Sequence, residues 1–285
     1  MNNKKRYEVS SIQSSIAITQ QFSTSFTLGI FCLKKEIRNP IYGIYGFVRV
    51  TDEIVDTFHE QDQSSELDHF EEATKLAIKN QFSTNPVLHS FQAVVNQYHI
   101  DDNLIQSFFH SMRTDIYINR HTEESYSDYI YGSAEAVGLM CLKVFVNGNE
   151  QKYQDMSPAA KRLGAAFQKV NFLRDLKDDY EQMGRLYFPN LMRKNGFDEK
   201  AKQKIEIEID QDFTAAYEGI IQLPRSSKFG VYLAYRYYKN LFLKLKNLKP
   251  HELFEGRIRI GNLRKLSLIP STYYLSIVNQ RSYNY

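Results

Sequence analysis

Residues 39–58 read NPIYGIYGFVRVTDEIVDTF. Asn39 is a good helix cap and Pro40 suits the first helical position, where its missing N–H is harmless, so a helix is predicted from Pro40 onwards. Polar side chains follow one stripe of that helix, at offsets of zero, four, seven and eleven residues: Tyr45, Arg49, Asp52 and Asp56. The neighbouring residues are mostly apolar, so we expect this helix to be buried over most of its surface.

The two aspartates of this stripe need a compensating partner. Burying an unpaired carboxylate is very costly, and two carboxylates one helical turn apart repel each other. A cation between them removes both costs. Magnesium suits such a position because it takes one or two carboxylates and completes its coordination with water and substrate phosphate.

A second segment, residues 165–189, reads AAFQKVNFLRDLKDDYEQMGRLYFP and repeats the pattern. Its polar stripe has offsets of zero, three, seven and eleven residues: Gln168, Asn171, Asp175 and Asp179. Arg174, Arg185 and Tyr187 supply hydrogen-bond donors nearby. Two antiparallel helices that each present an aspartate pair could face each other across a cavity and hold a metal cluster with diphosphates.

Two other interpretations of these stripes remain open. Both stripes could be solvated helix faces with local ion pairs, since a lone DxxxD pattern is common. A di-iron bundle is the rival metal site, but it needs two helical Glu-x-x-His motifs. The chain offers only Glu66-x-x-His69, in a polar segment.

The bulk composition is that of an ordinary globular protein with one unusual figure. The chain has 285 residues, 42% of them hydrophobic, and its net charge of +3 is dispersed, which argues against a nucleic-acid partner. There are 20 Tyr and 19 Phe but no Trp. These aromatic residues indicate either an aromatic core or a large apolar cavity lined by rings that suit apolar or cationic guests.

The two cysteines, Cys32 and Cys141, lack metal-ligand spacing and fit a reduced cytoplasm as buried thiols. No secretory signal is visible at the N-terminus, and no stretch is apolar enough to span a membrane. We therefore expect a cytoplasmic protein.

Hydrophobic residues recur at helical spacing along the chain, and no repeat or linker divides it. We therefore expect a single all-α domain covering residues 1–285. The alternating KIEIEI of residues 204–209 has no partner strand in view and is interpreted as helix. The predicted helices are 9–21, 24–35, 40–60, 63–79, 85–98, 102–116, 123–147, 150–154, 157–183, 199–219, 228–246, 250–255 and 262–280.

The segments IYGFVRVTDEIVD (residues 44–56) and QKVNFLRDLKDDYEQMGRLYFP (residues 168–189) resemble the two aspartate-rich signatures of the phytoene and squalene synthase family. Residues 23–26 resemble its short serine-containing motif, and YIYGSAEAVGLM (residues 129–140) resembles its central helix, where small residues border the prenyl cavity. The likeness runs in order from about residue 20 to about residue 265. It implies an isoprenoid-synthase helical bundle around a central cavity.

The resemblance also implies roles for individual residues. The metal ligands would be Asp52, Asp56, Asn171, Asp175 and Asp179. Arginine forks would hold diphosphate oxygens directly: Arg49, Arg174 and Arg257. The remaining polar surface would come from Ser23, Ser25, Tyr45 and Gln168. Tyrosines near the reacting carbons would be Tyr129, Tyr187 and Tyr238. Residues expected to line the dry, apolar part are Phe26, Gly132, Ser133, Ala136, Val137, Gly138 and Leu163, with plain helix packing as the alternative for each of them.

The sequence departs from the family pattern at three positions. Glu53 stands where many members have Asp; it is expected to point away from the stripe, without loss. Thr24 stands where some members carry a basic residue, and Gly256 replaces a common acidic residue before Arg257.

By this resemblance the chain is an Mg²⁺-dependent prenyltransferase of carotenoid biosynthesis, with Mn²⁺ as a possible substitute. It would condense two geranylgeranyl diphosphates head to head into phytoene through a cyclopropyl (prephytoene) diphosphate. One alternative is squalene or dehydrosqualene synthesis from two farnesyl diphosphates. No glycine-rich dinucleotide motif is visible, so no nicotinamide cofactor is expected. An alternative of another class is a non-catalytic relative that acts in assembly or binding, against which all four aspartates argue.

An apolar product implies docking on a membrane, at its inner face. The expected docking segment mixes basic and apolar residues near the C-terminus: Arg257, Arg259, Arg264, Lys265, Leu268 and Ile269. A solvated terminal helix is the alternative for that pattern. The oligomeric state is left open.

Overall fold

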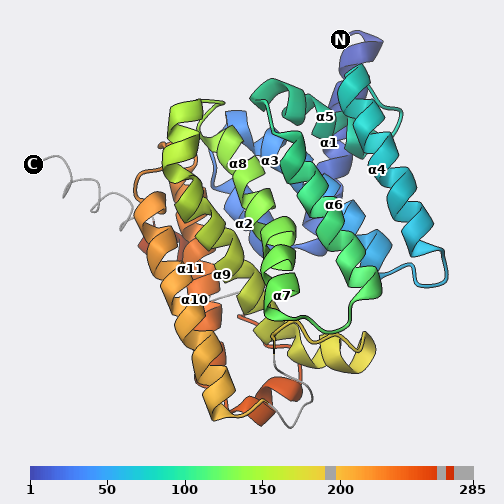
Figure 1. The fold of residues 1–285 in the computed structure, drawn as a ribbon. Coiled ribbons are helices and arrows are strands. Elements are labelled where there is room, and N and C mark those ends of the chain that lie inside the picture. The colour runs from blue at the N-terminus through green and yellow to red at the C-terminus, as the bar shows by residue number, and fades with distance from the viewer. Residues whose placement is uncertain (190–196, 262–267, 273–285) are drawn as a thin grey trace, which may run out of the picture.

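Two long helices, α3 (Lys35–Asp56) and α9 (Glu150–Gln182), carry the two polar stripes. The structure is a computed structural model that describes residues 1–189, 197–261 and 268–272 (Figure 1). Within these residues the chain is helical and has no β-strand, apart from an isolated bridge between Arg120 and Leu186. The predicted all-α class is therefore confirmed.

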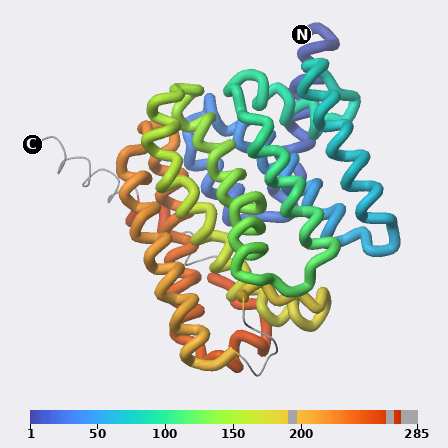
Figure 2. Tube along the Cα trace, in the orientation of Figure 1, coloured from blue at the N-terminus to red at the C-terminus, as the bar shows by residue number. Residues whose placement is uncertain are grey.

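The other described helices are α1 (Asn3–Phe22), α2 (Thr24–Phe31), α4 (Gln63–Asn80), α5 (Pro86–Tyr98), α6 (Asp102–Tyr117), α7 (Glu123–Ile130), α8 (Ala136–Phe145), α10 (Glu199–Ile220) and α11 (Lys228–Lys246). A π-helical turn, η1 (Tyr131–Glu135), joins α7 to α8, and a short 3-10 helix, η3 (Pro250–Phe254), follows α11. The chain trace places α1 at the opposite side of the bundle from α10 and α11 (Figure 2).

The structure corrects the predicted start of the first stripe helix. α3 begins at Lys35, so Pro40 lies inside the helix and Asn39 is not its cap. The proline removes only the hydrogen bond to the carbonyl of residue 36, near the helix start. The two predicted helices 150–154 and 157–183 are likewise one helix, α9, with Pro158 inside it.

The alternating segment 204–209 is helical, as predicted, because it lies within α10. Ile205 and Ile209 are buried one turn apart, whereas Ile207 is 52% exposed. The predicted helix 123–147 is interrupted by the π-turn η1. Of the predicted helix 262–280, residues 268–272 are helical and the rest lies outside the described residues.

Aromatic packing holds the first half of the bundle together. Phe47 of α3 stacks on Phe91 of α5 with ring centroids 3.9 Å apart, and it also contacts Phe108 and Phe109 of α6. All four side chains are almost completely buried. A second apolar cluster joins α9 to α10 and α11. The stripe helix α3 therefore packs in the first cluster, and the stripe-bearing part of α9 packs in the second.

Candidate active site

A cavity of about 640 Å³ lies between α2, α3, α8, α9 and α11. One end is polar and is formed by the C-terminal halves of α3 and α9, and the other end is apolar. Of the residues expected to bind metal or substrate or to act in catalysis, all except Ser25 lie on this lining: Ser23, Phe26, Tyr45, Arg49, Asp52, Asp56, Tyr129, Val137, Gly138, Gln168, Asn171, Arg174, Asp175, Asp179, Tyr187, Tyr238 and Arg257.

Ser25 lies outside the lining because of the register of α2. Ser23 caps this helix and accepts a hydrogen bond from the Phe26 backbone N–H at 3.2 Å. The face of α2 that reaches the cavity then carries Phe26, Gly29 and Ile30. Ser25 falls beside that face.

The α3 stripe is held by ion pairs. Arg49 Nη1 donates to Asp52 Oδ2 at 2.6 Å, and its other terminal nitrogen pairs with Glu53. Glu53 was expected to point away from the stripe, and it does not line the cavity. Its carboxylate nevertheless pairs with Arg49, which belongs to the stripe. Asp56 accepts a hydrogen bond from Arg185 Nη1 at 2.7 Å.

The α9 stripe has a similar arrangement around Asp175. Arg174 donates to both oxygens of this carboxylate, at 2.9 and 2.5 Å. Arg257, which follows η3, approaches the same carboxylate with its Nε at 2.9 Å. Two guanidinium groups therefore converge on one aspartate, in the paired geometry that carboxylates and phosphates both accept.

Two carboxylates at the polar end, those of Asp52 and Asp179, have raised pKa values. Burial, followed by the neighbouring carboxylate of Asp56, raises the pKa of Asp52 to about 6. Burial, followed by Asp175 and Asp56, raises the pKa of Asp179 to about 8. Removing these charges from water and placing them near one another disfavours the ionised forms.

The residues at this end fit a divalent cation that oxygen donors bind. The side-chain amide oxygen of Asn171, Oδ1, is buried and has no hydrogen-bond partner among the described residues. Burial and the neighbouring carboxylates raise the pKa values of Asp52 and Asp179, so a cation bound beside them would favour their ionised forms. Within the described part of the chain, no three His, Cys, Asp or Glu side chains form a complete metal-binding group. A magnesium ion that takes few protein ligands and several phosphate or water oxygens is compatible with that geometry.

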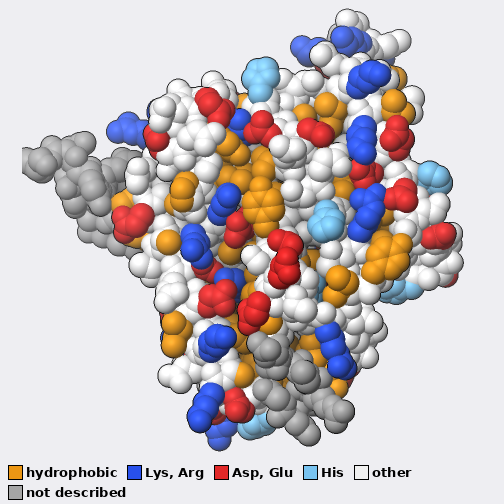
Figure 3. All heavy atoms as spheres, viewed as in Figure 1, with side chains coloured by type: hydrophobic (Ala, Val, Ile, Leu, Met, Phe, Trp, Pro, Cys, Tyr) orange, Lys and Arg blue, Asp and Glu red, His pale blue; other side chains and the backbone are white. Residues whose placement is uncertain are grey.

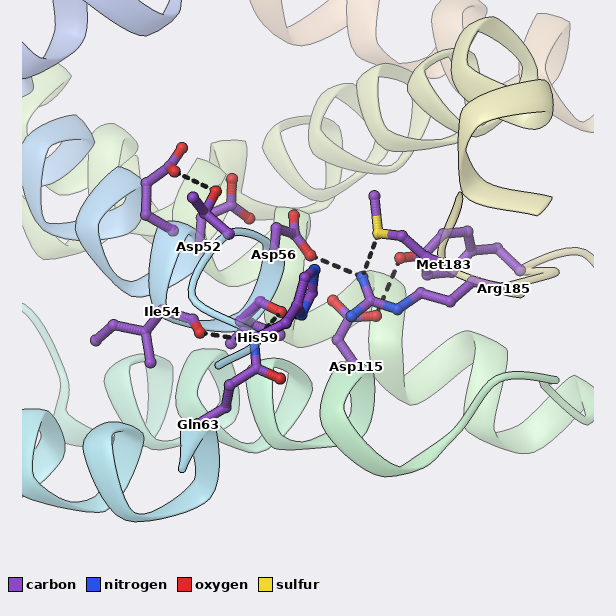
Figure 4. A network of polar contacts seen from close by, with 12 residues as sticks. Asp52, Ile54, Asp56, His59, Gln63, Asp115, Met183 and Arg185 are labelled. Carbon is purple, nitrogen blue, oxygen red and sulfur yellow. Dashed lines mark hydrogen bonds and ion pairs between the residues drawn. The ribbon is translucent and has the colours of Figure 1, made fainter. Parts of the chain in front are cut away.

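A buried carboxylate missed by the sequence analysis connects the tyrosines. Asp115 of α6 accepts hydrogen bonds from the hydroxyls of Tyr129, at 2.5 Å, and Tyr187, at 3.0 Å. Burial raises the pKa of Asp115 to about 7, against the opposing effect of Arg185. Figure 4 shows Arg185 between Asp56 and Asp115. Arg185 had been noted only as a donor close in sequence, and here it joins the two carboxylates electrostatically.

A sequence signal for Asp115 existed. Leu104, Phe108, Ser111 and Asp115 have offsets of zero, four, seven and eleven residues, the same spacing as in the α3 stripe. All four are buried. An aspartate in register with such an apolar stripe points into the bundle.

Aromatic rings form the wall next to the polar end. The Phe26 ring lies 5.0 Å from the ring of Tyr45 and 6.1 Å from that of Tyr238. Phe167 stacks on Tyr238 with ring centroids 4.0 Å apart. These rings present π faces beside the arginines and aspartates, which is a suitable surface for a cationic guest.

The small residues of the central helix divide into two groups. Ser133, Val137, Gly138 and, from α9, Leu163 line the cavity as expected. Gly132 and Ala136 do not. A Cβ on Gly132 would lie 2.1 Å from the carbonyl oxygen of Ser107, so this glycine allows close packing of η1 on α6. Ala136 is completely buried.

Both cysteines are partly buried, whereas buried thiols were expected. Cys141 nevertheless lines the apolar part of the cavity, and burial raises the pKa of its thiol to about 12. Its thiol is therefore neutral at ordinary pH.

The expected membrane segment near the C-terminus is only partly described. Arg257 is engaged with Asp175, and Leu268 is buried. Arg264 and Lys265 lie outside the described residues. No described helix has both the length and the apolar composition needed to cross a bilayer.

Residues 19–264 match the family described as Squalene/phytoene synthase. A 15-cis-phytoene synthase of Synechocystis sp. is 29% identical over 280 residues, covering 89% of this chain and 81% of the relative. A phytoene synthase of Arthrospira platensis is 26% identical over 283 residues, covering 89% of each chain.

Solved structures share the fold. A dehydrosqualene synthase in complex with ligand superposes with a TM-score of 0.82 at 20% identity, covering 98% of this chain and 99% of the other. The squalene synthase HpnC from Alicyclobacillus acidocaldarius has a TM-score of 0.74 at 17% identity, covering 87% of this chain and 95% of the other.

Proposed function

The chain belongs to the squalene/phytoene synthase family, whose members act on prenyl diphosphates, and on that premise we propose that it condenses two C20 prenyl diphosphates head to head into phytoene. The observation that carries this proposal is the meeting of the two aspartate helices at the polar end of one apolar cavity. In the overall reaction, two C20 diphosphates lose two diphosphate groups and two protons, and one C40 hydrocarbon is formed.

The polar end would bind both diphosphates. Asp52, Asp56, Asp175, Asp179 and the free amide oxygen of Asn171 would hold magnesium. The metal supplies positive charge that neutralises a departing diphosphate. Arg49, Arg174 and Arg257 are placed to donate directly to diphosphate oxygens, because their guanidinium groups already pair with carboxylates at that end.

The apolar part would protect the carbocation that remains. Phe26, Tyr45, Phe167 and Tyr238 offer ring faces to positive charge beside the ionisation site. Beyond them the lining is apolar, which excludes water that would capture the cation. The second prenyl chain would then attack through its double bond, and loss of one proton would close the ring of the cyclopropyl diphosphate. A second ionisation would rearrange that ring, and loss of a second proton would give the hydrocarbon.

Tyr129 and Tyr187 would act as neutral groups beside the reacting carbons. Burial and the negative charge of Asp115 raise the pKa of both phenols well above the usual value of 10. Each hydroxyl donates a hydrogen bond to Asp115 and keeps its proton. The lone pairs of each phenol oxygen therefore point away from Asp115. Asp115 would thus fix the orientation of both phenols without contacting substrate.

Condensation of C15 chains to dehydrosqualene or squalene is the second candidate. The specific observation in its favour is the superposition with a dehydrosqualene synthase over almost the full length of both chains. The polar end would be used identically, and only the depth of the apolar part would differ.

One assay separates these candidates. Purified protein with magnesium is offered geranylgeranyl or farnesyl diphosphate, and the products are identified by mass. A C40 hydrocarbon from the C20 substrate, abolished by a chelator and restored by Mg²⁺, is expected. A C30 product from farnesyl diphosphate alone would replace phytoene synthesis by the second candidate, and no turnover of either substrate would refute both.

A further inference from the structure

Five cations surround the outside of the cavity at its apolar end. They come from two segments, residues 28–38 and residues 221–231, and are Lys34, Lys35, Arg38, Arg225 and Lys228. From their placement we infer that this surface, together with Phe31, docks on an anionic lipid bilayer. It is called the basic face below.

The two segments lie against each other. The Lys34 backbone N–H donates to the Ser226 carbonyl at 2.9 Å. A Cβ on Gly230 would lie 2.6 Å from the Gly29 carbonyl oxygen, so α11 and α2 are in close backbone contact. The five cations therefore belong to one continuous region of the surface.

The five cations have few acidic neighbours in the described structure. No ion pair among the described residues involves any of the five. Glu36 is the only acidic residue in either segment, whereas the whole chain has a net charge of +3. With five cations and one carboxylate, the two segments together carry more net positive charge than the whole chain. On the face seen in Figure 3, in contrast, basic and acidic side chains are interspersed.

Helix stability does not explain these positions. Lys34 is the cap residue of α3 and Lys35 its first residue, and Lys228 is the first residue of α11. Cations at helix N-termini are unfavourable, because the helix dipole is positive there. Neither cap residue, Lys34 or Ser227, makes a side-chain capping hydrogen bond. The charges are therefore retained against a local cost, which an anionic surface would offset.

An exposed aromatic residue accompanies the charges. Phe31 ends α2 and is 63% exposed. The Arg38 guanidinium lies over its ring, 4.8 Å from the centroid. An aromatic side chain surrounded by basic residues is a typical interfacial anchor, since the ring enters the headgroup region while the cations contact lipid phosphates.

The position of the basic face connects it to the cavity. Leu33, Leu223 and Gly230 line the apolar end from inside, and they belong to the same two segments. A bilayer on the outside of these segments would lie next to the part of the cavity that holds hydrocarbon. The benefit of this arrangement for product release rests on the proposed function, whereas lipid binding itself does not.

Vesicle sedimentation tests the inference. The wild-type chain is mixed with vesicles of phosphatidylcholine alone or of phosphatidylcholine with phosphatidylglycerol, at low and high salt. Binding only to the anionic vesicles, weakened by salt, is expected. The exposed pair Lys34→Glu with Arg225→Glu should weaken binding at least about 25-fold, since each surface cation contributes roughly fivefold. Phe31→Ser should weaken binding without changing its salt dependence.

The matched control is Lys4→Glu with Lys5→Glu, which makes the same charge change at the exposed N-terminus of α1. Equal losses in the two double variants, or no binding by the wild type, would overturn the inference. So would a dimer that the Lys34→Glu, Arg225→Glu pair dissociates in light scattering, because the face would then bind a second copy. Turnover in detergent, measured on all variants, reports the proposed function separately.

Discussion

Asp56 and Arg185, which are 129 residues apart in sequence, are joined by a 2.7 Å ion pair at the polar end of the cavity. Arg185 is buried and also lies beside Asp115. This contact fastens the segment after α9 to the end of α3. It also supplies positive charge to two carboxylates that would otherwise be poorly compensated.

A double-mutant cycle measures this contact. In metal-free protein, Asp56→Asn and Arg185→Gln should each change the free energy of unfolding in urea, with a coupling of about 1–3 kcal/mol between them. The coupling arises because either single change leaves a partly buried partner unpaired. Strictly additive effects would mean that the two side chains do not interact in solution.

Neutralising Asp175 should lower activity strongly. Asp175→Asn keeps the size of the side chain but removes a proposed metal ligand and the counter-charge of two arginines. We expect turnover with Mg²⁺ to fall at least about 100-fold, or about 3 kcal/mol of transition-state stabilisation. Asp155→Asn, at an exposed position on the same helix, is the control and should retain wild-type turnover.

Asp115 should affect kcat more than KM, because it orients Tyr129 and Tyr187 but does not line the cavity. Asp115→Ala should lower kcat by about 10- to 100-fold, since two buried hydroxyls lose their acceptor. Asp115→Asn should recover part of the loss, because an amide oxygen can still accept. Steady-state kinetics on both variants decide this. Equal kcat losses in the two would show that the charge, and not the acceptor, matters.

The stability of the metal-free protein should fall as pH rises. Asp52, Asp115 and Asp179 have pKa values of about 6, 7 and 8, against an ordinary value of 3.8. The folded state therefore holds more protons than the unfolded state between about pH 4 and pH 8. The stabilising contribution of these protons is complete below about pH 4 and is lost progressively up to about pH 8.

Thermal unfolding in chelator across this range checks the sign. A melting temperature that rises steadily from pH 5 to pH 8 would contradict it. Adding Mg²⁺ with inorganic pyrophosphate should raise the melting temperature most at the alkaline end, because the carboxylates are then ionised and ready to bind the cation.

Gly132→Ala should destabilise the fold. Its added methyl would collide with the Ser107 carbonyl and with Ser111 Oγ, both 2.1 Å away, and we expect a loss of about 2–3 kcal/mol. Gly29→Ala is the matched control, since its Cβ would meet only ordinary contacts at 3.7 Å. Alanine should stabilise α2 there by roughly 0.5–1 kcal/mol. Urea unfolding measures both, and a neutral Gly132→Ala would refute the packing role.

The two polar stripes could be predicted from sequence because helical spacing and buried charge are local signals. Asp52 and Asp175 were found in this way, and the structure places both at one cavity. Asp115 has the same spacing within α6, but a single buried aspartate gives no second carboxylate to suggest a site. Its role depends on Tyr187, which is 72 residues away. Contacts over that distance are set by helix packing and leave no local pattern.

Other features depended on tertiary context. Pro40 was expected to start a helix, yet α3 extends five residues further towards the N-terminus and buries the proline. The π-turn that begins at Tyr131 lies where Gly132 approaches α6 closely, and no helical periodicity reveals that contact. Gly132 and Gly138 look equivalent in sequence, and both pack closely against a neighbouring helix, but only Gly138 also lines the cavity.

Helix α9 has 33 residues and is therefore about 50 Å long, and it lines the cavity from Met156 to Gln182. The same rigid rod thus forms part of the apolar wall of the cavity at one end and carries the carboxylates of the polar end at the other. Redesign of the product length by enlarging residues on this rod risks tilting Asp175 and Asp179 out of alignment, so that selectivity and rate would change together. Substitutions at Gly29 and Ile30, towards the end of the short helix α2, offer a way to alter the depth of the chamber, because α2 carries no carboxylate.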